Sequence, residues 1–142
     1  MEGAISNQPP PEETRFLEMV FPEQSNHYGT LFGGTALSLM GKAAFVAASR
    51  RARRAVVMAS SEKVDFHLPV KVGQVVELHA QVVRIGRTSM TVIVEMVAET
   101  LLSGQRALAM RGSFEMVTVD ATGRPAEMAA VTISPSTEEP VS

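Results

Sequence analysis

The sequence predicts an α+β domain in which one five-stranded antiparallel sheet curls around one long helix. Residues 35–52 are rich in Ala, Leu and Met, and Lys42 is their only charged residue before Arg50. Such a segment favours a helix that the rest of the protein covers. The later segments alternate apolar and polar residues, as half-buried strands do. Glycines separate those segments by short links, which favours antiparallel hairpins.

The expected elements follow these patterns along the chain. A short strand ends before Pro22, a glycine-containing loop covers residues 22–34, and the helix runs over about residues 34–52. The predicted strands cover residues 15–21, 55–67, 75–85, 88–99 and 106–119. A sheet of five strands leaves open edges, and an open edge can pair with a second copy of the chain. We therefore expect a homodimer.

Length and composition are typical of one globular domain. The chain has 142 residues, of which 45% are hydrophobic and 20% charged, enough for a single core. Residues 1–13 contain three consecutive prolines and are expected to form a disordered arm. Residues 14–132 form the predicted single domain, and residues 133–142 form a flexible tail.

Several classes of function are disfavoured by composition. The net charge is -2, with 13 Lys and Arg against 15 Asp and Glu, so we expect no nucleic-acid partner. The absence of Cys excludes disulfides, thiolate metal sites and cysteine nucleophiles. Three scattered His predict no metal site. No apolar run reaches the roughly 18 residues of a membrane span. The acidic, proline-rich start and the lack of Cys favour the cytoplasm.

The segment from Asn26 to Gly34 carries the clearest functional signal. A polar loop runs through glycines into the start of the predicted helix. Backbone N–H groups at a helix start lack intrahelical partners and lie at the positive end of the helix dipole. They suit a carbonyl oxygen that gains negative charge during acyl transfer. The alternative is a glycine-rich turn that only starts the helix.

Two segments resemble the hot-dog-fold acyl-CoA thioesterases, specifically their broad-specificity acyl-CoA hydrolase branch. They are NHYGTLFGGTALSLM, followed by KAAFVAASR, and VDFHLPVKVGQVVELHAQVVRIGRTSMTVIVEM. The resemblance covers about residues 16–119. It implies hydrolysis of acyl-CoA, with coenzyme A as part of the substrate and no other cofactor. It also implies dimers that often form hexamers as trimers of dimers.

The resemblance assigns roles to the loop residues. Asn26 matches a family asparagine that orients water or substrate near the thioester. Gly33 and Gly34 match glycines whose backbone amides polarise the thioester carbonyl. His27 lies beside this site and is a substrate-binding candidate. The alternative for Asn26 is a turn residue whose side chain hydrogen-bonds nearby backbone.

The family pattern is broken at Gly41. Where this branch carries an aspartate that acts as general base or nucleophile, the chain has glycine, which can do neither. Either hydrolysis is weakened and acyl-CoA binding is kept, or another carboxylate supplies the base. Glu62, which also matches a family glutamate at the substrate site, and Asp65 are the candidates. Strand alternation places these two residues, three positions apart, on opposite faces.

A second substrate-binding segment is predicted between the third and fourth strands. Two arginines and two hydroxyl groups surround a glycine turn, and Arg grips phosphate through paired hydrogen bonds. In the family this turn binds the phosphates and pantetheine of coenzyme A. The corresponding residues are Arg84, Arg87, Thr88 and Ser89. The alternative is an ordinary basic hairpin.

We therefore expect an acyl-CoA thioester hydrolase that is weakened at Gly41. The main alternative is an acyl-CoA binding protein with little or no activity. A hot-dog dehydratase is disfavoured because the histidines have no evident catalytic partners in the sequence.

Overall fold

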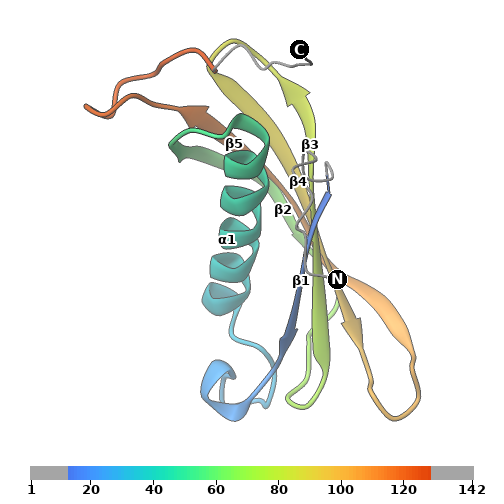
Figure 1. Ribbon diagram of the computed structural model, residues 1–142. Helices are drawn as coiled ribbons and strands as arrows, with labels where there is room; N and C mark the ends of the chain where they lie inside the picture. The colour runs from blue at the N-terminus through green and yellow to red at the C-terminus, as the bar shows by residue number, and fades with distance from the viewer. Residues whose placement is uncertain (1–12, 129–142) are drawn as a thin grey trace, which may run out of the picture.

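The computed structural model describes residues 13–128 and shows one antiparallel sheet with a single long helix on one face (Figure 1). The strand order is β1-β3-β4-β5-β2, with every neighbouring pair antiparallel. This arrangement confirms the predicted fold. The elements are β1 (Glu13–Met19), the 3-10 turn η1 (Pro22–Gln24), α1 (Gly33–Ala52), β2 (Val56–Phe66), β3 (Val75–Ile85), β4 (Ser89–Glu99) and β5 (Arg106–Thr118).

The largest boundary difference lies in the first strand. It begins at Glu13 and ends at Met19, two residues earlier at each end than predicted. Glu13 pairs with Gln81 of β3, so its assignment to the disordered arm is wrong. The remainder of the arm, residues 129–132 and the tail lie outside the described residues.

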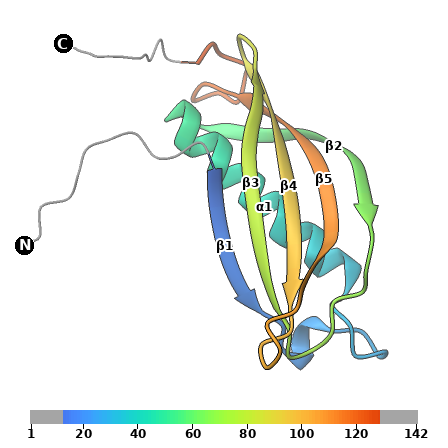
Figure 2. The same ribbon diagram turned by 90° about the vertical axis from the view of Figure 1, so that its right-hand side faces the viewer.

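Small side chains let α1 lie close against the sheet. The helix runs diagonally across one sheet face (Figure 2). Its buried side is mostly alanine, and the alternating side chains of β3, β4 and β5 face it. Phe114 is the largest of the fully buried side chains. The buried residues of α1 are Ala36, Leu39, Met40, Ala43, Ala44, Ala47, Ala48 and Ala52.

The opposite side of α1 is apolar but exposed. Leu37 and Phe45 retain 39% and 47% of their accessible surface. On the neighbouring edge strand β2, Met58 faces the helix and retains 43%, whereas Val57, which retains 48%, lies on the other face of the sheet. A single sheet covers only one side of a helix, so one chain leaves this apolar surface open.

Strand β2 is irregular. Its register with β5 shifts between Met58 and Ser60 and again between Glu62 and Asp65, and Lys63 has a φ of 48°. An extra residue at a β-bulge reverses the alternation of side chains that follows it. Glu62 therefore lies opposite Ser113 and Asp65 opposite Arg111.

These partners on β5 are two residues apart and so share a sheet face. The expectation that Glu62 and Asp65 lie on opposite faces is wrong, because the bulge adds a residue that simple alternation does not count.

The sheet face away from α1 carries ion pairs. Arg106 pairs with Glu77 at 2.7 Å and with Glu99 at 3.0 Å. The hydrogen bond from Arg106 holds the pKa of Glu77 below its usual range. His79 lies 3.1 Å from Glu13, and this contact lowers the pKa of Glu13. These charges link β1, β3, β4 and β5 on the far side of the sheet from the helix.

Candidate functional site

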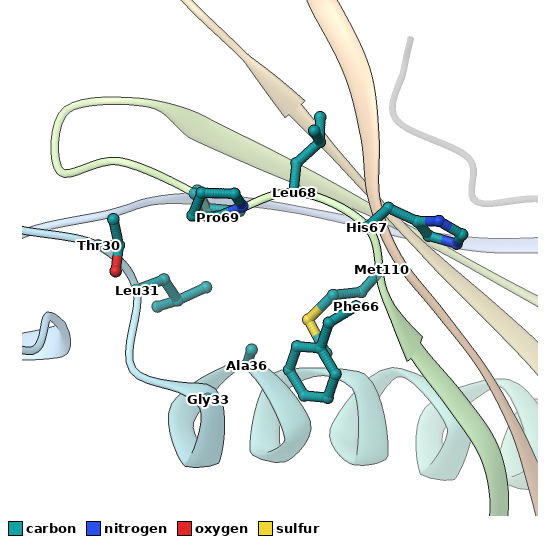
Figure 3. A pocket seen from close by; sticks show the side chains of 10 residues that line it. Thr30, Leu31, Gly33, Ala36, Phe66, His67, Leu68, Pro69 and Met110 are labelled. Carbon is teal, nitrogen blue, oxygen red and sulfur yellow. The ribbon is translucent and has the colours of Figure 1, made fainter.

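A pocket of about 300 Å³ lies between the first turn of α1 and the segment that follows β2 (Figure 3). In the close view, Leu31 and Met110 lie on opposite sides of the cavity, and the ring of His67 points away from Leu31. The wall is mainly apolar, which suits an acyl chain or another apolar group. The lining residues are Thr30, Leu31, Gly33, Ala36, Phe66, His67, Leu68, Pro69, Val70 and Met110.

The wall formed by residues 66–70 was not predicted as part of a site. The sequence indicates a strand that ends near Pro69, and nothing in its pattern shows that the exit from the strand passes the helix start. Two hydrogen bonds fix this exit, because the backbone N–H groups of His67 and Leu68 both donate to the carbonyl of Ala109. The site prediction missed these residues.

Open backbone donors lie at the helix start. Phe32 is the N-cap and offers no side-chain cap, and Ala36 N–H donates to the Phe32 carbonyl at 3.0 Å. Within residues 13–128, the backbone N–H groups of Gly33, Gly34 and Thr35 have no protein partner, as expected for the first helical residues. Gly33 lines the pocket. Of the two predicted amide donors, the pocket lining therefore includes Gly33 but not Gly34.

Gly34 leaves room for the neighbouring aromatic ring. A Cβ built on Gly34 would come 2.9 Å from Phe32 Cε2. Glycine at this position lets the Phe32 ring lie against the helix start, and it leaves the Gly34 N–H without a side chain over it.

Asn26 holds the loop that precedes the helix. Its Oδ1 accepts hydrogen bonds from Tyr28 N–H at 2.9 Å, Thr30 N–H at 3.2 Å and the Thr30 hydroxyl at 3.1 Å. This is the turn-forming geometry that the sequence offered as the alternative reading. The Nδ2 group has no partner among the described residues, so the same side chain can also donate a hydrogen bond to a ligand.

Apart from Gly33, the residues predicted near the thioester, Asn26 and Gly34 included, are absent from the pocket lining. His27 is exposed, and its ring centroid lies 4.0 Å from that of Tyr28. Gly41 lies about 12 Å along the helix from Gly33, at 1.5 Å per residue. Glu62 and Asp65 are exposed and are absent from the pocket lining.

The predicted phosphate-binding hairpin lies at the opposite end of the protomer from the pocket. The β3–β4 turn is at the upper end in both overall views, and the start of α1 is at the lower end (Figures 1 and 2). The 20-residue helix between these ends is about 30 Å long. A single chain therefore does not bring Arg84, Arg87, Thr88 and Ser89 to Asn26 and Gly33.

The two hairpin arginines differ in their partners. Arg84 donates to the Thr91 hydroxyl at 2.8 Å, the Ser89 hydroxyl at 3.0 Å and the Glu115 carboxylate at 2.8 Å. Among residues 13–128, the Arg87 side chain pairs only with Glu127, at 3.1 Å, and it is 83% exposed. Exposed pairs of this kind contribute little, so Arg87 is the freer of the two to bind an anion.

The residues from 13 to 128 contain no cluster of three or more His, Asp or Glu side chains suited to holding a metal ion. In the same part of the chain, no helix is both long enough and apolar enough to cross a membrane.

Comparison with known proteins finds relatives that are all named as acyl-CoA hydrolases or thioesterases. The uncharacterized acyl-CoA thioester hydrolase YkhA of Bacillus subtilis is 36% identical in an alignment of 137 positions that covers 91% of this chain and 78% of YkhA. A crystal structure of an apo-hexameric acyl-CoA thioesterase is 39% identical with a TM-score of 0.80, covering 82% of this chain and 74% of that one.

An acyl-CoA hydrolase from Agrobacterium tumefaciens is 44% identical with a TM-score of 0.77. The match covers 86% of this chain, which spans only about half (48%) of the Agrobacterium chain. An acyl-CoA hydrolase from Staphylococcus aureus, in complex with butyryl coenzyme A, coenzyme A and coenzyme A disulfide, is 31% identical with a TM-score of 0.78. That match covers 82% of this chain and 71% of the other.

The Staphylococcus aureus hydrolase has also been solved as three single-alanine variants. They replace an asparagine, an aspartate 15 residues after it, and a threonine 17 residues after the aspartate. The family profile of the Thioesterase superfamily matches residues 28–104, which include α1, β2, β3 and β4. The fold, the pocket at the helix start and the relatives described above agree with this match. The chain belongs to the Thioesterase superfamily.

Proposed function

We propose that this protein is an acyl-CoA thioester hydrolase whose reaction site is the pocket at the start of α1. The observation that carries the proposal is an open amide donor at Gly33, followed by that of Gly34, where Gly33 lines a mainly apolar cavity. A thioester has the same two parts, a carbonyl that needs hydrogen-bond donors and an acyl chain that needs apolar surroundings. The named relatives act on such thioesters.

The reaction needs little beyond positioning and a proton acceptor. Water attacks the carbonyl carbon, and the carbonyl oxygen gains negative charge beside the helix N-terminus, where amide dipoles stabilise it. The C–S bond then breaks, coenzyme A leaves as a thiolate that takes up a proton, and the acid remains. In this proposal, Asn26 Nδ2 orients the water or the carbonyl. The helix itself supplies no base at Gly41.

Gly41 also supports a second candidate, an acyl-CoA binding protein. Counting the staphylococcal intervals of 15 and 17 residues from Asn26 leads to Gly41 and then Met58. On this correspondence the asparagine is kept, while the aspartate and threonine positions carry glycine and methionine. A site that keeps binding groups and loses a carboxylate and a hydroxyl is suited to holding its ligand with slow turnover.

Release of coenzyme A separates the two candidates. The protein is incubated with acyl-CoA of several chain lengths, and free thiol is measured beside calorimetric binding of the same compounds. We expect saturable thiol release, slower than in relatives that keep the aspartate, since a positioned general base contributes about 10²–10⁴-fold. Binding without any thiol release above the spontaneous rate would support the binding protein instead.

We propose further that the functional unit contains at least two chains. The exposed apolar side chains Leu37, Phe45 and Met58 adjoin the open edge of β2, and edges of this kind pair with other strands. Two antiparallel β2 strands related by a two-fold axis would cover this surface in both copies.

Such pairing also brings the two halves of the predicted site together. Antiparallel strands run in opposite directions, so the β3–β4 hairpin of one copy lies toward the helix start of the other. The fourth strand is two positions from the β2 edge, about 10 Å at the usual strand spacing. This supports a site built from both chains.

We expect light scattering at micromolar concentration to give a mass at least twice 15.2 kDa. The physical reason is the cost of leaving an apolar helix side and a sheet edge in water. Replacement of Phe45 by Glu should lower the mass, whereas Lys42→Glu on the same helix should leave it unchanged. A 15 kDa particle for the unmodified protein would contradict the shared site.

Arg87→Ala is expected to weaken coenzyme A binding by about 1.5–3 kcal/mol, the usual worth of a hydrogen bond to a charged group. Added salt should weaken binding to the unmodified protein as well. Calorimetry with coenzyme A measures both effects. Arg111→Ala is the matched control, because Arg111 is a half-exposed arginine that pairs with Glu95 on the sheet. Equal affinities in all three proteins would remove Arg87 from the site.

A further inference from the structure

Met58 occupies the space above Gly41. A Cβ built on Gly41 would lie 3.2 Å from Met58 Cε, closer than an ordinary van der Waals contact. Met58 is on β2, where it pairs in register with the buried Met116 and so faces the helix. The thioether end therefore lies where the first atoms of a longer side chain at position 41 would be.

The surroundings of position 41 are apolar. Leu37 and Phe45 lie one turn to either side of Gly41 on the exposed stripe of α1, and Met58 covers it from β2. On the β2 side, a carboxylate held here would meet the Met58 thioether, which donates no hydrogen bond.

We propose that Met58 is a second activity-determining residue, which together with Gly41 leaves this position without a base and without a hydrogen-bonding partner from β2. The inference rests on the proposed hydrolase function. It makes a specific claim about the pair: a carboxylate introduced at position 41 acts as a base only when Met58 is replaced by a smaller, hydrogen-bonding residue. Gly41 and Met58 are thus coupled, and neither exchange alone restores the polar arrangement.

A double-mutant cycle tests the coupling. The unmodified protein, Gly41→Asp, Met58→Thr and the double variant are compared by kcat and KM for one acyl-CoA, with melting temperatures as a check on folding. We expect less than tenfold gain in kcat from either single variant and a gain of about 10²–10⁴-fold from the double variant. KM should change much less, because a base acts mainly in the transition state.

Two further variants test the assigned roles. Gly41→Asn with Met58→Thr keeps the shape of the double variant without a base and should stay slow. Gly41→Asp with Met58→Leu keeps an apolar cover and should also stay slow. The double variant with Asp and Thr should lose kcat as pH falls and the carboxylate is protonated, which the Asn variant should not do.

Chemical rescue gives a test without a new carboxylate side chain. Met58→Ala opens the space above Gly41, so added formate should raise its kcat in proportion to concentration until the space is filled. Formate should not raise kcat in the unmodified protein, where Met58 fills that space. The formate experiment tests the proposal even if the double variant does not fold.

The outcomes separate this proposal from the general function. Thiol release by the unmodified protein supports hydrolysis whatever the cycle shows. Equal gains in Gly41→Asp alone and in the double variant would overturn the role of Met58. So would a folded double variant no faster than the parent, or a Met58→Ala protein that formate does not accelerate.

Discussion

Asn26→Ala is expected to lower kcat for acyl-CoA hydrolysis by about 10²–10³-fold, the usual cost of removing one positioned donor from a reacting carbonyl. The Asn26 side chain combines two tasks. Its Oδ1 accepts three hydrogen bonds that shape the loop up to Thr30, and its Nδ2 has no partner in the described part of the chain. Alanine removes both groups, and steady-state thiol release measures the result.

Asn26→Asp separates the loop role from the catalytic role. A carboxylate keeps an oxygen to accept the bonds from Tyr28 and Thr30 but has no N–H to donate. We expect its melting temperature to stay near that of the unmodified protein while kcat falls. Asn26→Ala should also lose about 1–3 kcal/mol of stability, because loop donors are left without an acceptor. Full turnover in both variants would leave Asn26 a turn residue only.

Phe114→Ala is expected to lower the free energy of unfolding by about 3–5 kcal/mol, the range for a large aromatic removed from a packed core. Phe114 is 2% exposed on β5. A Cβ built on the nearby Gly112 would lie 3.1 Å from the Phe114 ring and 3.3 Å from Met40 Cε. Phe114 thus packs where the sheet supports the turn of α1 that contains Gly41.

Urea unfolding at one fixed protein concentration measures this loss, since association makes apparent stability depend on concentration. Phe114→Leu keeps most of the buried volume and should cost clearly less than Phe114→Ala. A loss below about 1 kcal/mol for Phe114→Ala would contradict the packing described, because typical domains are stable by only about 5–15 kcal/mol.

The regular parts of the fold could be predicted from residue patterns. The apolar, alanine-rich segment became α1, and the strict alternation around Leu78 and Val94 became central strands. The edge strand β2 was harder. Its two register shifts and the positive φ of Lys63 occur where it pairs with β5. The residue pattern of β2 alone does not reveal that pairing.

The candidate site was predictable where local sequence determines it. Gly33 opens α1 and lines the pocket, and its unpartnered amide follows from its place at a helix start. The wall around His67 and the cover that Met58 places over Gly41 depend on how β2 crosses the helix. Contacts between residues 17 or more apart, across a bulged strand, need the three-dimensional structure.

A crystal structure with a non-hydrolysable acyl-CoA analogue that keeps the carbonyl tests the account most directly. We predict that the carbonyl oxygen lies about 2.7–3.1 Å from the backbone nitrogen of Gly33 or Gly34, as amide stabilisation of an oxyanion requires. The acyl chain should enter the pocket beside Leu31 and Met110. A carbonyl bound away from the start of α1, with that pocket empty, would contradict the proposed reaction site.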